Sequence, residues 1–187
     1  GTNGKSSIAD FYYQILNLNN KKVASIGTLG VKSKKFKKNL SNTTIDPIQL
    51  SIILSNLKKQ NINNVIMEAS SHGLRQNRLD GLSFNTGIFT NLSQDHMDYH
   101  KNIKNYLKAK LYLFEKLIKK NGNIITDEKI SEYNQIKKIA SKKNLNLFSL
   151  LNKKNKFQFL SHQFEDESQL LRIKYNNSTY KIKLNLI

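Results

Sequence analysis

The chain has 187 residues, with 31 Lys and Arg against 13 Asp and Glu, and it contains no cysteine. The lack of cysteine excludes a disulfide framework and a thiolate metal site, and the length is sufficient for one domain with its own core. The sequence has no apolar run long enough to cross a bilayer and no recognisable signal peptide. We therefore expect a cytoplasmic protein without membrane insertion.

The net charge of +18 raises the question of a nucleic-acid partner, since strongly basic proteins often bind phosphate backbones. The excess is nearly all lysine, because Arg75, Arg78 and Arg172 are the only arginines, and the chain is also rich in Asn and Ile. This pattern indicates a compositional bias, and the densest basic run, residues 32–38, is interpreted as a solvated loop. We expect a monomer that does not bind nucleic acid, although a polyanionic small substrate would suit the charge.

Apolar periodicity predicts alternating helices and strands through about residue 150, which is typical of a parallel α/β sheet flanked by helices. The expected elements are, in chain order, a helix over 6–18, a strand over 23–27, an irregular or lysine-edged hairpin segment over 28–41, a helix from Asp46-Pro47 to about 60, strands over 64–68 and 86–89, a helix over 105–118, a strand over 123–126, a helix over 128–140 and a strand over 145–150. Asp46 is the expected N-cap of the second helix.

The pattern changes after residue 150, where three strands follow one another at 157–164, 169–175 and 179–187. The last two are expected to form a hairpin at Asn176-Asn177-Ser178. The predicted organisation is thus one domain over 1–187, with an α/β core over 1–150 and an antiparallel β extension over 151–187. Because the chain starts inside a loop and ends inside a strand, we expect a longer enzyme.

The first seven residues, Gly1-Thr2-Asn3-Gly4-Lys5-Ser6-Ser7, have the composition of a phosphate-binding loop. Glycines let main-chain N–H groups approach phosphate oxygens, a lysine supplies a cation for the β- and γ-phosphates, and Ser6 can offer a hydroxyl to Mg²⁺. The helix that follows would add its N-terminal dipole. The full motif also needs an earlier glycine and a leading strand. A polar glycine turn that caps a helix is therefore the alternative interpretation.

Polar side chains follow two of the expected strands, at the sheet edge where ligands of such proteins bind. Glu68 ends one strand, in position to face a Mg²⁺ ion, although a helix-capping or surface role is the alternative. The segment after Phe89 contains His96 and His100, four residues apart. Zinc hydrolysis is not expected, since Met97 stands where the zinc-protease motif has glutamate, and a single histidine assisting Mg²⁺ fits better.

Gln76 and Arg78 follow the Ser70-Ser71-His72 turn. An arginine is the natural bidentate partner of a carboxylate or phosphate, so Arg78 is a candidate substrate clamp. An ion pair between Arg78 and Asp80 is the alternative.

Taken together, these segments resemble the Mur ligases of peptidoglycan synthesis, in that family's order and spacing. The resemblance covers Gly1 to Ser7, Asn42-Thr43-Thr44, Met67-Glu68-Ala69-Ser70-Ser71-His72-Gly73-Leu74, Gln76 with Arg78, Thr90-Asn91-Leu92-Ser93-Gln94-Asp95-His96-Met97-Asp98-Tyr99-His100, and Ala109-Lys110. It implies the central ATPase domain of a three-domain enzyme. The segments are most similar to the family member that adds the third peptide residue.

That resemblance implies ATP-dependent amide-bond formation through an acyl phosphate, with Mg²⁺ and ATP as cofactors. The substrates would be UDP-N-acetylmuramoyl-L-alanyl-D-glutamate and a diamino acid, for which meso-diaminopimelate is the commoner choice. The implied roles are phosphate binding by Gly1, Thr2, Asn3, Gly4, Lys5, Ser6 and Ser7; Mg²⁺ binding by Ser6, Glu68, His96 and a carbamylated Lys110; catalysis by Lys5, His96 and Lys110; and substrate binding by Asn42, Thr43, Thr44, Ser70, Gln76 and Arg78. Carbamylation would turn a cation that repels Mg²⁺ into a carboxylate that binds it, whereas an ordinary exposed lysine is the alternative.

Two departures from the family pattern are small. Ser6 and Ser7 stand where threonines are frequent, which keeps the hydroxyls, and Lys101 stands where glycine is frequent. The alternatives are a related amide ligase such as folylpolyglutamate synthase, or a basic nucleotide- or nucleic-acid-binding module without catalysis. We expect the 187 residues alone not to catalyse ligation.

Overall fold

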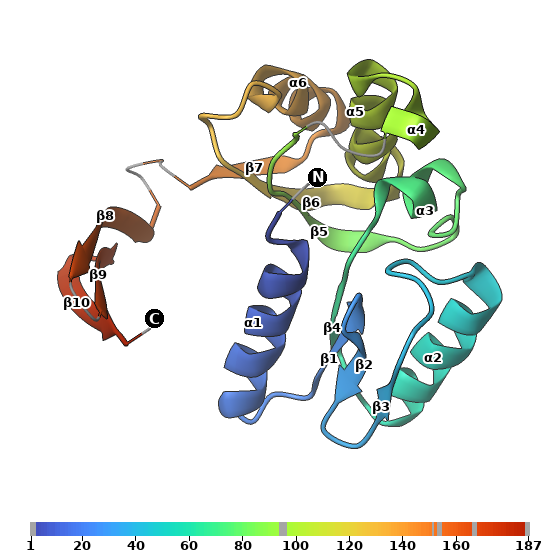
Figure 1. Ribbon diagram of the computed structural model, residues 1–187, viewed down its shortest axis with the longest axis horizontal. Helices are drawn as coiled ribbons and strands as arrows, with labels where there is room; N and C mark the ends of the chain where they lie inside the picture. Colours follow the sequence, from blue (N-terminus) through green and yellow to red (C-terminus); the bar gives the residue numbers. More distant parts are fainter. Residues whose placement is uncertain (1–2, 94–96, 151, 153–154, 166–167, 186–187) are drawn as a thin grey trace.

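The computed structural model describes residues 3–93, 97–150, 152, 155–165 and 168–185, and these form three small sheets with helices around two of them (Figure 1). The helices are α1 (Lys5–Leu18), α2 (Pro47–Lys59), α3 (Ser71–Arg75), α4 (Met97–His100), α5 (Ile103–Tyr112) and α6 (Tyr133–Lys143), with a π-helical turn at Leu113–Leu117. The strands are β1 (Val23–Gly27), β2 (Gly30–Ser33), β3 (Lys37–Lys38), β4 (Asn64–Met67), β5 (Phe84–Phe89), β6 (Ile118–Thr126), β7 (Asn146–Ser149), β8 (Phe157–Glu165), β9 (Ser168–Tyr175) and β10 (Ser178–Leu184).

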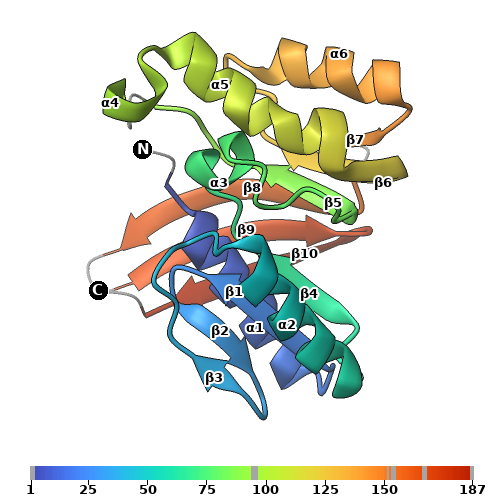
Figure 2. The same ribbon diagram turned by 90° about the vertical axis from the view of Figure 1, so that its right-hand side faces the viewer.

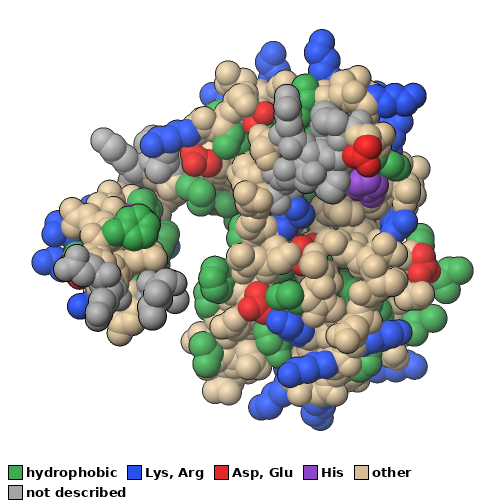
Figure 3. Space-filling view, in the orientation of Figure 1, with side chains coloured by type: hydrophobic (Ala, Val, Ile, Leu, Met, Phe, Trp, Pro, Cys, Tyr) green, Lys and Arg blue, Asp and Glu red, His purple; other side chains and the backbone are tan. Residues whose placement is uncertain are grey.

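The first sheet has the order β3-β2-β1-β4, in which β1 and β4 are parallel and β1, β2 and β3 form antiparallel hairpins. The second sheet, β5-β6-β7, is entirely parallel. The third, β10-β9-β8, is antiparallel, and it stands apart from the rest beside α1 (Figures 1 and 3). The predicted α/β class with an antiparallel extension near the C-terminus is confirmed.

Two apolar clusters hold the first and second sheets against their helices. Residues of β1 and α2, among them Ala24, Ile26, Leu50, Ile53 and Leu57, share the first cluster. The second cluster joins β5 and β6 to the helices above them in Figure 2 and contains Phe89, Phe114, Ile124, Ile136 and Ala140. The strands of both sheets are therefore anchored to the helices by packed apolar side chains.

Helix α1 begins at Lys5, within the predicted phosphate-binding loop of residues 1–7, and is tied to the first sheet by an ion pair. Lys32 on β2 donates to Asp10 over 2.8 Å, and this hydrogen bond holds the pKa of the Asp10 carboxyl below its usual value. The outer side of the helix is apolar but exposed at Phe11, Ile15 and Leu18. Among the described residues, no helix is long and apolar enough to span a membrane.

Helix α2 begins as the sequence predicts. The Asp46 side chain accepts hydrogen bonds from the N–H groups of Ile48 and Gln49, at 3.1 and 3.0 Å, and Pro47 occupies the first turn. A short acidic acceptor satisfies donors that the helix itself cannot pair. The cap fixes where the chain leaves the loop that contains Asn42, Thr43 and Thr44.

Replacement of Asp46 by alanine should lower the stability by about 1 kcal/mol, because two N–H donors lose their acceptor. For a chain of this size, that corresponds to a fall in Tm of roughly 2–4 °C, measurable by calorimetry. Ser55→Ala, on the exposed middle of the same helix, is the control and should leave Tm nearly unchanged. An equal Tm for the two variants would contradict the capping role.

The structure corrects three element boundaries. The expected helix over 105–118 ends at Tyr112, where a π-helical turn leads straight into β6, and β6 begins at Ile118 rather than 123. The first part of β6 was not predicted as a strand because it is polar, with Lys119 and Lys120 exposed. Helix α6 starts at Tyr133 rather than 128, because Asp127 instead accepts from the Lys129 N–H in a turn.

Candidate functional site

Glu68 is the centre of the site and directly follows β4. Its side chain is 4% exposed, and both carboxylate oxygens accept hydrogen bonds. Oε1 accepts from the Thr28 N–H at 2.8 Å, while Oε2 accepts from the hydroxyls of Ser6 at 2.8 Å and Thr28 at 3.2 Å. The carboxylate therefore joins the first turn of α1, in the predicted phosphate-binding loop, to the ends of β1 and β4.

Gly27 makes room for this carboxylate. It is the last residue of β1, and a Cβ atom there would overlap the Cγ, Cδ and Oε1 atoms of Glu68. The close approach follows from the parallel register, which pairs Ile26 with Met67 and so brings the next residue of each strand together. A glycine is thus required for space at this position.

The predicted phosphate-binding loop is held by a pair of asparagines. Gly4 has the left-handed conformation, with φ 86°, and no side chain caps the N-terminus of α1. The Asn3 N–H donates to the Asn91 Oδ1, and the Asn91 side-chain Nδ2 donates to the Asn3 carbonyl, each over 3.1 Å. Among the described residues, the first N–H groups of α1 therefore have no side-chain cap, and helix N-termini of this kind can bind anions. Gly1 and Thr2 lie outside the described residues, and Ser7 is exposed.

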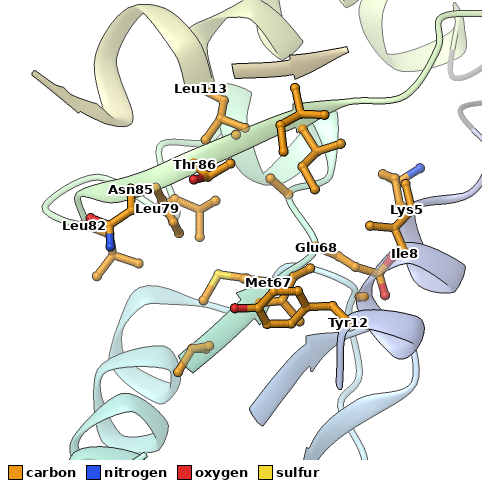
Figure 4. Close-up of a pocket in the computed structure, with 18 of the residues that line it drawn as sticks. Lys5, Ile8, Tyr12, Met67, Glu68, Leu79, Leu82, Asn85, Thr86 and Leu113 are labelled. Atoms are coloured by element: carbon orange, nitrogen blue, oxygen red, sulfur yellow. The ribbon is translucent and has the colours of Figure 1, made fainter. Parts of the chain in front are cut away.

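Lys5 and Lys110 line the same cavity of about 630 Å³ as Glu68. Figure 4 shows Lys5 and Glu68 in this cavity. The Lys110 Nζ lies 5.5 Å from the ring centroid of Phe89 and 5.3 Å from that of Tyr106. Three residues singled out from separate parts of the sequence therefore line one cavity. His96, the other expected Mg²⁺ ligand and catalytic residue, lies outside the described residues.

Thr44 connects the 42–44 loop to Glu68, Ser70 and Arg78. It is 3% exposed, and its hydroxyl donates to the Glu68 carbonyl at 3.1 Å and accepts from the Ser70 N–H at 2.9 Å. Arg78 donates to the Thr44 carbonyl at 2.6 Å. Here Arg78 holds the 42–44 loop beside α3. The alternative interpretation of Arg78, an ion pair with Asp80, is not found among the described residues, where a hydrogen bond from the Tyr112 hydroxyl reaches Asp80 instead. This bond raises the pKa of Tyr112.

The remaining predicted substrate contacts lie around this junction. Thr43 is half-buried, with its hydroxyl 3.0 Å from that of Thr28, and Asn42 is exposed. Ser70 caps α3 by accepting from the Gly73 N–H at 3.1 Å. Gln76 is exposed and donates to the Tyr99 hydroxyl at 3.2 Å. The part of these residues in substrate binding stays a prediction.

The backbone conformation of Lys101 shows why glycine is frequent at this position in the family. It has φ 66°, a left-handed conformation that favours glycine. We expect Lys101→Gly to stabilise the protein by about 1 kcal/mol and to raise Tm by roughly 2–4 °C in a thermal melt. Lys104→Gly, inside α5, is the matched control and should lower Tm, because glycine weakens helices. A fall in Tm for both variants would refute the strain at Lys101.

Sequence reasoning missed three residues of the site: Gly27, Thr28 and Asn91. Thr28 follows the carboxyl end of β1, so the rule that selected Glu68 could have selected it too. Asn91 lies inside a segment that was singled out, but its pairing with Asn3 depends on the folded chain. Gly27 was noted only as a strand end.

The oxygen atoms of Ser6, Thr28 and Glu68 are the kind of ligands that Mg²⁺ takes, with few protein groups and several waters or phosphate oxygens. Within the described ranges, no group of three or more His, Cys, Asp or Glu side chains gathers to hold a metal. A single carboxylate with hydroxyl neighbours therefore fits a Mg²⁺ ion that is bound together with a nucleotide better than it fits an all-protein metal centre.

A model of the Mur ligase middle domain matches residues 1–187, and the chain therefore belongs to the Mur ligase family. It is 36% identical over 187 residues to UDP-N-acetylmuramoyl-L-alanyl-D-glutamate–2,6-diaminopimelate ligase of Zymomonas mobilis, covering all of this chain. A solved structure of a ligase with the same name has a TM-score of 0.81 at 24% identity over the whole chain and 38% of that protein. The FPGS–AMPPCP complex shares the fold, with a TM-score of 0.66 at 10% identity over the whole chain and 52% of that protein.

The chain spans 38% of the Zymomonas ligase. The match thus concerns the middle domain of such an enzyme.

Proposed function

We propose that this chain is the ATP-binding middle domain of the ligase that adds the third residue, meso-diaminopimelate, to UDP-N-acetylmuramoyl-L-alanyl-D-glutamate in peptidoglycan synthesis. The observation that supports it best is the meeting of Lys5, Ser6 and Glu68 beside the start of α1. The AMPPCP complex among the fold neighbours supports ATP as the nucleotide. The identity of the diamino acid rests on the name of the similar ligases.

In this proposal the chain positions two anionic reactants and neutralises their charge. The N–H groups of the first turn of α1 and the Lys5 ammonium hold the β- and γ-phosphates of ATP. Mg²⁺, held by Ser6 and Glu68 with His96 and a carbamylated Lys110, would supply charge neutralisation between the phosphate oxygens. The substrate's glutamyl carboxylate takes the γ-phosphoryl group to give an acyl phosphate, and the incoming amine then displaces phosphate.

The substrate side of the site would lie along the loop held by Thr44. Asn42, Thr43 and Gln76 present polar groups there, while Arg78 and Ser70 fix the loop to α3. An ordered loop lowers the entropy cost of placing the glutamyl carboxylate in line with the γ-phosphate.

The test is ligation by the full-length protein with UDP-muramoyl dipeptide, ATP and either meso-diaminopimelate or L-lysine. Formation of tripeptide and ADP with diaminopimelate is the expected result. Turnover of a folate substrate, with none of the muramoyl substrate, would instead support a folylpolyglutamate synthase. The 187 residues alone should produce no tripeptide. Cytoplasmic location, a monomeric state and the absence of nucleic-acid binding stay predictions.

If Lys110 acts as a carbamate, activity should depend on dissolved CO₂. In full-length protein we expect Lys110→Ala and Lys110→Arg to lose activity roughly 100-fold alike, because neither can form the carboxylate that binds Mg²⁺. Depletion of bicarbonate should lower the wild-type rate, and its return should restore it. The measurement is the initial rate of ADP release.

Lys108→Arg is the matched control for this prediction, since Lys108 is an exposed lysine on the same helix. It should retain the wild-type rate and the same response to bicarbonate. Full activity of Lys110→Arg would show that only the positive charge is needed and would reject the carbamate.

A further inference from the structure

The Tyr99 side chain is held between two histidines. Tyr99 lies in α4, which is beside α3 in the fold (Figure 1). Its ring centroid is 4.1 Å from that of His72 on α3, with 35° between the ring planes, and 4.9 Å from that of His100, with 85° between the planes. Ring pairs at such distances stabilise one another. The Tyr99 ring therefore has a defined position, although it is only half-buried.

His100 anchors this group of rings in the interior. Its side chain is 1% exposed, and its Nε2 atom lies 3.0 Å from the hydroxyl oxygen of Ser71, which is also buried. The centroid of its ring lies 5.0 Å from that of Tyr106 on α5. Burial of polar groups is costly unless they form hydrogen bonds. The buried pair of His100 and Ser71 thus fixes α4, and with it Tyr99, against α3.

Gln76 stands directly after α3, on a backbone that the helix end fixes. Its N–H donates to the His72 carbonyl at 2.9 Å, and the Arg78 N–H donates to the Gly73 carbonyl at the same distance. Asn77, between Gln76 and Arg78, has φ 54°. A left-handed residue with a hydrogen bond that reaches back five residues is typical of a helix C-terminus. The Gln76 side chain therefore starts from a defined point.

The side chain of Gln76 is exposed, and Tyr99 restricts its orientation. Its Nε2 atom donates to the Tyr99 hydroxyl at 3.2 Å. Such a bond contributes modestly to stability, but it favours one rotamer of a long side chain that would otherwise sample several. A primary amide has two N–H groups and one oxygen. With one N–H on Tyr99, the other N–H and the oxygen suit a group that both donates and accepts, such as a peptide group.

Gln76 lies within reach of the dipeptide part of the proposed substrate. The glutamyl carboxylate has to meet the γ-phosphate beside Glu68, and Ser70, two residues after Glu68, is the N-cap of α3. Gln76 follows six residues later, which is about 9 Å along a helix axis. Two extended residues span about 7 Å. The alanyl-glutamate part of the substrate, rather than its uridine, therefore has the length needed to extend from the strand end toward Gln76.

We propose that Tyr99 is a positioning residue for the substrate: it orients the Gln76 amide so that this amide binds a peptide group of UDP-N-acetylmuramoyl-L-alanyl-D-glutamate. His72 and His100 hold the Tyr99 ring, and its hydroxyl holds the amide. The inference rests on the substrate proposed above and adds the part of it that Gln76 recognises. Loss of the Tyr99 hydroxyl would release the amide, so substrate binding would weaken while the chemical step would keep its rate.

The test measures binding of the dipeptide substrate to the full-length protein by calorimetry, with Tyr99→Phe as the main variant. This change keeps the ring and removes only the hydroxyl. Kd and KM for the dipeptide substrate should rise about three- to tenfold, with kcat and KM for ATP nearly unchanged. Kd for UDP-N-acetylmuramic acid, which has the uridine and the sugar but neither amino acid, should stay the same. Tyr112→Phe, which loses the hydroxyl bonds to Asp80, is the matched control and should bind both ligands like the wild type.

Gln76→Leu shows whether Tyr99 acts through Gln76. Leucine should weaken binding at least as much as Tyr99→Phe, and the double variant should bind no more weakly than Gln76→Leu alone, because the hydroxyl then has no amide to orient. Additive losses would overturn the proposal, as would an unchanged Kd in Tyr99→Phe or an equal rise for both ligands. In each of these cases the wild type would still bind and ligate the dipeptide substrate, so the proposed function would stand. A wild-type protein that did not bind this substrate would refute the proposed function and this inference with it.

Discussion

Glu68→Gln should lower the ligation rate of the full-length protein by roughly 10²- to 10³-fold, the largest effect expected from one substitution here. The amide keeps the shape of the side chain, its oxygen can still accept from the Thr28 N–H, and the Ser6 and Thr28 hydroxyls can turn to accept from its nitrogen. What it loses is the negative charge that would hold Mg²⁺. Tm should therefore change little, whereas the Mg²⁺ concentration needed for half-maximal rate should rise.

Glu115→Gln is the matched control, because Glu115 is an exposed glutamate on the π-helical turn. Its rate and Mg²⁺ dependence should equal those of the wild type. A Glu68→Gln variant that retained the wild-type Mg²⁺ dependence would show that Glu68 supports the loop without binding the metal.

Gly27→Ala should inactivate the enzyme almost as strongly, although it leaves every predicted site residue in place. The new methyl group would occupy the space of the Glu68 carboxylate, which must then leave its hydrogen bonds to Ser6 and Thr28. Crowding of a packed site costs about 1–3 kcal/mol, so Tm should also fall by several degrees. Activity and Tm are measured on the same preparation.

Gly81→Ala separates the loss of stability from the loss of the site. Gly81 has φ 85° and open space around its Cα, so alanine there is strained by about 1–2 kcal/mol without touching Glu68. This control should lose Tm but keep its rate at a temperature where it is folded. A Gly27→Ala enzyme as active as Gly81→Ala would contradict the close packing of Gly27 on Glu68.

The alternation of strands and helices could be predicted because the buried strands are short apolar runs and Asp46 marks a helix start. The boundary at β6 could not, since exposed lysines at 119 and 120 hide the strand. Helix α3 has five residues, Ser71–Arg75, too few for apolar periodicity to be visible. The local sequence therefore predicts which helices and strands form, whereas tertiary packing determines the residues at which they end.

The candidate site could be predicted to the extent that it consists of strand ends and a glycine-rich loop. Glu68 and Lys5 follow from those rules alone. The contact of Gly27 with Glu68 requires the register of β1 against β4, and two apolar strands do not define their register from sequence. Thr44 likewise becomes a junction only when the 42–44 loop meets α3.

The left-handed turns of this chain are made mostly by asparagine. Of the seven non-glycine residues with positive φ in the described part, six are asparagines: Asn20, Asn61, Asn77, Asn121, Asn144 and Asn176. Asparagine tolerates this conformation, yet in the unfolded chain it samples fewer conformations than glycine does. The asparagine-rich composition, which at first indicated only a bias of the sequence, therefore reduces the entropy that these turns lose when the protein folds.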